Sequence, residues 1–105
     1  MTAVPALAVE VTVLWNELNS NAMAFKQKYV GKSATVTGIV WIIDGEVTPG
    51  QVSLTAPKSF GTMLTCVVSN KNSLLPLAKG KPVTVSGTIK SVGPAGIYME
   101  PCRVQ

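Results

Sequence analysis

The chain has 105 residues, of which 47% are hydrophobic and 13% are charged, and its formal net charge is +4. This composition indicates a compact globular chain of one domain and excludes an intrinsically disordered one. No apolar run reaches the length that a bilayer-spanning helix needs. The mild positive charge permits an anionic partner without requiring one.

The first predicted element is a helix at about residues 11–30, after an N-terminal tail of residues 1–10. Apolar residues recur there at the three- and four-residue spacing of one buried helical face. They are Val11, Leu14, Trp15, Leu18, Ala22, Phe25 and Tyr29. Gly31 stands where a left-handed cap would end the helix. We expect the apolar face of this helix to pack on the rest of the domain, which would extend to residue 105.

A long strand follows within residues 29–44, which read YVGKSATVTGIVWIID. Its β-branched residues favour a strand, while Gly38 at its centre predicts a bend. A long first strand that bends can serve two sheets, as small barrels require. The string at residues 31–38 also returns in similar form at residues 80–87. Both copies predict a turn, a strand and a kink.

Four more strands are predicted, separated by glycine- and proline-rich turns. They lie at residues 51–56, 62–68, 81–89 and 97–104. Between the second and third of these, Leu74, Leu75 and Leu77 would cover an open end of a barrel. Five strands at short, even spacing predict a small β-barrel over about residues 32–104.

A helix with Asn and Ala leads into a Lys-Tyr-x-Gly-Lys junction and a Val-x-Gly-x-Val strand at residues 21–32 and 36–40. Together with the segments 65–67, 79–87 and 99–104, this pattern resembles the bacterial tRNA_anti-like family of OB-fold proteins. The likeness covers roughly residues 14–104. The resemblance implies a mainly-β fold, namely a five-stranded OB-fold Greek-key barrel of strand order 1-2-3-5-4-1 preceded by an N-terminal helix. It also implies nucleic-acid binding, with single-stranded DNA or RNA as the partner, and an envelope location for many members.

The two cysteines can be placed on this expected barrel. The third and fifth strands of an OB-fold are neighbours, so Cys66 and Cys102 can bridge if their α-carbons lie within about 7 Å. The alternative is two buried thiols. An even cysteine count in a small domain and the implied envelope location favour the disulfide. The family resemblance and the cysteine pair suggest a periplasmic or cell-envelope location, and the cytoplasm stays open as an alternative.

The sequence indicates neither an enzyme nor a metal or cofactor site. There is no histidine to act as a general base near neutral pH, and two cysteines do not complete a zinc shell. No Gly-x-Ser-x-Gly nucleophile elbow is present. The Gly-Lys-Ser of residues 31–33 lacks the upstream glycine of a phosphate-binding loop. We therefore expect a non-catalytic binding module.

Nucleic-acid binding by an OB-fold usually combines a basic groove with aromatic side chains on the second and third strands. The positions expected to point outward there are neither aromatic nor charged: Gln51, Ser53, Thr55, Met63, Thr65 and Val67. The remaining candidates lie in the connections, and they would have to converge on one rim. They are Lys58, Phe60, Lys79, Lys81 and Lys90.

A protein-interaction or assembly module of the envelope is the alternative function. Ile39, Trp41 and Ile43 form a second apolar row on the first strand, in addition to the row that fills the barrel. Either the N-terminal helix covers this row or it is free to contact another protein. Oligosaccharide binding is a third option, for which Tyr98 is the only aromatic residue on the last two strands.

Overall fold

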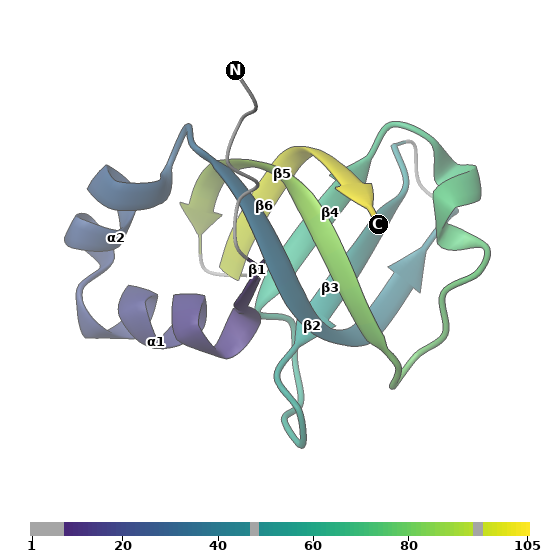
Figure 1. Ribbon diagram of the computed structural model, residues 1–105, viewed down its shortest axis with the longest axis horizontal. Helices are drawn as coiled ribbons and strands as arrows, with labels where there is room; N and C mark the ends of the chain where they lie inside the picture. Colours follow the sequence, from purple (N-terminus) through teal and green to yellow (C-terminus); the bar gives the residue numbers. More distant parts are fainter. Residues whose placement is uncertain (1–7, 47–48, 94–95) are drawn as a thin grey trace.

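The computed structural model describes residues 8–46, 49–93 and 96–105, and Figure 1 shows their arrangement. In chain order the elements are β1 (Ala8–Glu10), α1 (Val11–Ser20), α2 (Ala22–Tyr29), β2 (Ser33–Asp44), β3 (Gln51–Thr55), β4 (Leu64–Val68), the 3-10 helix η1 (Lys71–Leu74), β5 (Pro82–Gly93) and β6 (Gly96–Val104).

Five of the strands close into a barrel. They pair in the order β2-β3-β4-β6-β5, and β5 pairs again with β2. The β4–β6 pair is parallel, and the other pairs within the barrel are antiparallel. This is the order 1-2-3-5-4-1, so the predicted mainly-β fold of OB type is confirmed. Alternate residues of the strands, such as Val36, Leu54 and Ile89, fill the interior and are fully buried.

The predicted helix at residues 11–30 is in fact a pair of helices. Asn21 separates α1 from α2 because its backbone is extended (φ −160°, ψ 96°) and its side chain accepts a hydrogen bond of 3.1 Å from Ala24 N. An asparagine at this place starts a new helix better than it continues an old one. Both helices lie at one end of the barrel in Figure 1, where Leu14 and Phe25 join the core.

The opposite end of the barrel is covered by η1 and the residues after it (Figure 1). Leu74 is buried there, and Leu77 packs against the core. Leu75, expected to do the same, is exposed.

The last residues of the predicted N-terminal tail are part of the sheet. Residues 8–10 form β1, which runs parallel to β2 and places Glu10 opposite Thr37. Residues 1–7 of that tail lie outside the described residues.

The two copies of the repeated string lie side by side as the antiparallel β2–β5 pair, which we call the ribbon. Gly31 and Gly80 have the same positive φ of 86°, and each donates its N–H across the ribbon. Gly31 N bonds to Ile89 O at 2.7 Å, and Gly80 N bonds to Val40 O at 2.9 Å. The ribbon is therefore approximately twofold symmetric.

The bend expected at Gly38 lies elsewhere. The bulge in β2 falls between Val40 and Ile42, so Trp41 is the extra residue. Gly38 instead leaves room for the start of α1, because a Cβ at this position would lie 3.1 Å from Val11 Cγ1.

Candidate nucleic-acid interface

Three side chains from separate parts of the chain form one cluster: Trp41, Phe60 and Lys79. The Phe60 ring meets the Trp41 ring edge to face, with 5.9 Å between the ring centroids. Lys79 Nζ lies 4.7 Å from the centroid of the same indole ring. We call these three residues the aromatic cluster. They place two ring systems and one ammonium group within a few ångströms of one another.

The barrel brings these residues together through its strand pairing. The bulge puts Trp41 outside the regular pairing of β2 with β3. The bond from Gly80 N to Val40 O then holds the turn that carries Lys79 beside the residue preceding Trp41. Phe60 comes from the β3–β4 connection.

Two further predicted lysines lie close to this cluster. Lys81 O accepts a hydrogen bond of 2.9 Å from Val40 N, which places Lys81 at the same end of the ribbon as Trp41. Lys58 is in the connection that carries Phe60 and has a positive φ of 61°, a strained value for a residue with a side chain. Both lysines are exposed. Together with Lys79 they make this end of the barrel basic.

Lys90 does not belong to this group. It lies on β5 nine residues beyond Lys81, which corresponds to about 30 Å along a strand. Its ammonium pairs with Glu100 at 2.8 Å. The structure therefore brings four of the five predicted residues to one end and leaves Lys90 apart from them.

The apolar row predicted on the first strand is reordered by the bulge. Ile39 lies before the change of register, and Trp41 is the extra residue at it. Ile43 follows the bulge and pairs with the fully buried Val52, so it lies on the side of the strand that faces the barrel interior. Ile42, 48% exposed, takes the outward position instead. Trp41 belongs to the aromatic cluster, so the residues predicted for the two alternative functions overlap at this point.

The outer face of β3 and β4 offers little to a nucleotide. Ser53, Thr55 and Thr65, expected to point outward, are at most 9% exposed. Asp44 lies beside Gln51 on the same face and carries a negative charge. A phosphate backbone crossing this face would therefore meet the negative charge of Asp44 and no positive charge from Ser53, Thr55 or Thr65.

The predicted disulfide is present. Cys66 on β4 and Cys102 on β6 are bonded, with 5.4 Å between their α-carbons. The bridge ties together the two strands whose parallel pairing closes the barrel.

Two kinds of feature are missing from the described parts of the chain. No three of their Cys, Asp or Glu side chains lie close enough together to hold a metal ion. No helix within the same parts has the length and apolar character to cross a membrane.

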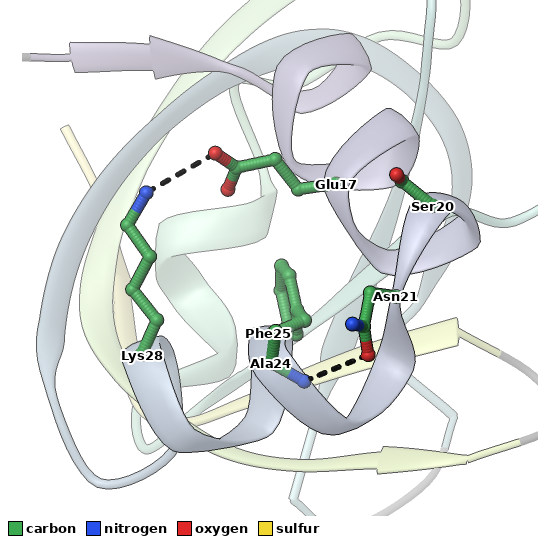
Figure 2. A pocket seen from close by; sticks show the side chains of 6 residues that line it. All are labelled: Glu17, Ser20, Asn21, Ala24, Phe25 and Lys28. Atoms are coloured by element: carbon green, nitrogen blue, oxygen red, sulfur yellow. Dashed lines mark hydrogen bonds and ion pairs between the residues drawn. The ribbon is translucent and has the colours of Figure 1, made fainter.

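A hollow of about 260 Å³ lies between α1 and α2, and sequence reasoning did not anticipate it. Figure 2 shows the ion pair of Lys28 Nζ with Glu17 Oε1 (3.1 Å) on one side, Asn21 on the other, and Phe25 between them. The Tyr29 hydroxyl and then Lys28 lower the pKa of Glu17, and Glu17 raises that of Lys28. Because Glu17 Oε1 and Lys28 Nζ pair with each other across the hollow, we interpret it as the junction of the helices.

The comparisons with known proteins agree with this architecture. The sequence model of the tRNA_anti-like family matches residues 1–102. Among solved structures, a lipoprotein from Klebsiella pneumoniae for which nucleic-acid binding has been suggested superposes with a TM-score of 0.75. It is 16% identical, and the alignment covers 95% of this chain and 92% of that one, so the likeness shows the fold alone. No curated protein sequence matches the chain.

Proposed function

Because the chain belongs to the tRNA_anti-like family, we propose that it is a non-catalytic module that binds single-stranded nucleic acid through the aromatic cluster. The observation that carries this proposal is the joint position of Trp41, Phe60 and Lys79. Bases stack on exposed aromatic rings, and a lysine beside the ring can contact the adjoining phosphate.

The exposure of the cluster supports this role. Phe60 is 85% exposed, so most of its ring is free to stack with a base. Trp41 is half-buried, so one part of its ring is anchored while another part is available. Lys58 and Lys81 add positive charge at the same end of the barrel, where it would attract a phosphate backbone.

The disulfide supports a location outside the reducing cytosol. Disulfides persist in oxidising compartments such as the bacterial periplasm and are rare in cytosolic proteins. We accordingly place the module in the cell envelope as part of this proposal.

The test is a titration of fluorescently labelled single-stranded DNA and RNA with the oxidised protein at two salt concentrations. We expect binding that weakens steeply as salt rises. Trp41→Ala and Phe60→Ala should each reduce the affinity by about tenfold, because one stacked base is worth about 1–3 kcal/mol. Lys90→Ala is the matched control: it removes a surface lysine far from the cluster and should leave the affinity nearly unchanged. Absence of binding at low salt, or equal losses in all three variants, would contradict the proposal.

The second candidate function is recognition of another protein. It is favoured by the exposure of Ile42 next to Trp41, at 48%. An apolar patch around a tryptophan is typical of a protein interface. This candidate becomes the better one if the titration shows no salt-dependent binding of either nucleic acid.

A further inference from the structure

The outer face of the ribbon carries a ladder of hydroxyl groups. Three cross-strand pairs form it: Ser33 with Thr88, Thr35 with Ser86, and Thr37 with Thr84. In the last pair the two Oγ1 atoms are 3.4 Å apart. Ser33 is exposed and the other five are half-buried, so the ladder is accessible to a ligand. Hydroxyl side chains are common donors to phosphate oxygens in nucleic-acid complexes.

Arg103, the chain's one arginine, lies at the side of this ladder. It is on β6 directly opposite Ser86. Its guanidinium is exposed, and neither of the salt bridges between described residues involves it. The fork of an arginine fits two oxygens of one phosphate, which makes an unpaired arginine beside hydroxyls a suitable phosphate anchor.

Two shallow hollows flank Arg103. One, of about 290 Å³, is shared with Ser69, Ser86 and Pro101. The other, of about 190 Å³, contains Thr35 and again Ser86. The guanidinium is thus bordered on both sides by concave surface lined with hydroxyl groups.

The ladder and the aromatic cluster are parts of one continuous surface. Val36 and Val40 of β2 point into the barrel, so Thr35, Thr37 and Ile39 between and beside them point outward and lead to Trp41. The seven residues from Thr35 to Trp41, six steps along the strand, span about 20 Å. This length suits the shortest site sizes of OB-folds, about four nucleotides.

Because the ribbon is approximately symmetric, a positively charged lysine lies at each of its ends. Lys81 O bonds to Val40 N at the end with Trp41, and Lys32 O bonds to Ile89 N in the equivalent position at the other end. Lys32 is exposed and lies next to Ser33, the last hydroxyl of the ladder. Glu10 instead places a negative charge beside the ladder, because β1 holds this acid opposite Thr37.

We propose that a single strand of nucleic acid runs from the aromatic cluster along the hydroxyl ladder of the ribbon to Arg103, instead of crossing the outer face of β3 and β4. This inference rests on the proposed function. Bases stack at Trp41 and Phe60, the hydroxyls contact successive phosphates, and Arg103 binds the phosphate that lies beside Ser86, at the middle pair of the ladder.

The first test compares labelled oligothymidylates of about two, four and eight nucleotides, lengths that bracket the short end of OB-fold sites. Trp41→Ala should weaken the binding of every length. Arg103→Ala should leave the shortest oligomer unaffected, weaken the longer ones by about tenfold, and reduce the slope of log affinity against log salt by about 0.7. Lys90→Ala, which also removes one surface cation, is the control and should change neither quantity.

The second test distinguishes the two possible paths by removing one acid from each face. Glu10→Gln takes a negative charge from beside the ladder, and Asp44→Asn takes one from the outer face of β3 and β4. If the strand follows the ribbon, Glu10→Gln strengthens binding of the longer oligomers by about twofold to fivefold and Asp44→Asn has little effect.

The results separate this inference from the function on which it rests. If Asp44→Asn strengthens binding of the longer oligomers and Glu10→Gln does not, the ribbon path is overturned. It is also overturned if Arg103→Ala has the same affinity and salt dependence as Lys90→Ala at every oligomer length. In both cases a loss with Trp41→Ala would still support the proposed function. If none of the oligomers binds, the path and the proposed function fall together.

Discussion

At the scale of single residues, Gly87 is the position where the barrel has least room. A Cβ at this residue would contact the carbonyl group of Pro101 and would lie 2.7 Å from Cys102 Cα. Both neighbours are backbone, so neither can move unless β6 shifts. We expect Gly87→Ala to lower the free energy of unfolding by about 3 kcal/mol or more, measured by urea denaturation.

Two other glycines provide the comparison. A Cβ at Gly38 would lie 3.1 Å from Val11 Cγ1 and 3.3 Å from Leu54 Cβ and Thr55 O, so its neighbours need shift by only a few tenths of an ångström and Gly38→Ala should cost about 1 kcal/mol. At Gly45 a Cβ would meet nothing within 4 Å, and Gly45→Ala should be nearly neutral. Equal stability of the Gly87→Ala and Gly45→Ala proteins would refute this ranking.

The members of the aromatic cluster could be selected from sequence, but their association could not. Phe60 and Lys79 are noticeable as an aromatic and a base in connecting segments. Trp41 belongs to a run of apolar residues, and alternation assigns it to a different surface. The contact between Trp41 and Lys79 depends on the pairing of β2 with the start of β5, and periodicity within one strand carries no information about that pairing.

At the scale of elements, the strands were easier to predict than the interruptions within them. Alternating β-branched residues and glycine-rich turns located all five barrel strands to within a few residues. The bulge at Trp41 was not predicted, because one extra residue in an apolar run leaves the composition of the run unchanged. It nevertheless moves every later side chain to the other face of the strand. The break between the helices at Asn21 was also not predicted, since the apolar spacing of α1 continues into α2.

The link between α1 and α2 should depend on pH. The Tyr29 hydroxyl and then Lys28 lower the pKa of Glu17 in the folded protein, so these two contacts stabilise the fold above the ordinary carboxyl pKa. That stabilisation is lost as the pH falls through the lowered pKa. We expect wild type to be slightly more stable than Glu17→Gln at pH 7, and this difference to shrink as the pH is lowered from 7 toward 3. Urea unfolding of both proteins at the two pH values measures this.

The effect should be small, because the pair is exposed to solvent and screened by salt. A stability difference between wild type and Glu17→Gln that is the same at both pH values would show that the side chain acts through packing and not through its charge.

At the scale of the whole molecule, the disulfide should supply much of the stability. Cys66 and Cys102 are 36 residues apart, and closing a loop of this size stabilises the folded state by about 4 kcal/mol in the chain-entropy model. The Cys66→Ala/Cys102→Ala protein should lose about this amount in urea unfolding, and wild type should lose a similar amount when reductant is added.

The double variant is its own control, because reductant should not change its stability. If wild type unfolds at the same urea concentration with and without reductant, the bridge does not stabilise the fold. A total stability of about 5–15 kcal/mol is usual for a domain, so a loss of this size would be easily measured.

The closed barrel itself followed from five evenly spaced strands together with the family resemblance. The part that did not follow is β1, because three residues with no visible alternation give no strand signal. Its formation depends on the backbone groups that β2 presents to it, which is tertiary information.

β1 also bears on how the protein avoids aggregation. β3 begins its pairing with β2 only at Ile39, and β1 takes the backbone beside Thr35, Val36 and Thr37 that β3 does not reach. Exposed strand edges are templates for pairing with a neighbouring chain, and natural proteins cover them. A chain that lacked residues 8–10 would keep its aromatic cluster, yet it would lose the packing of Val9 on the core and would offer this edge of β2 to other copies of the same chain.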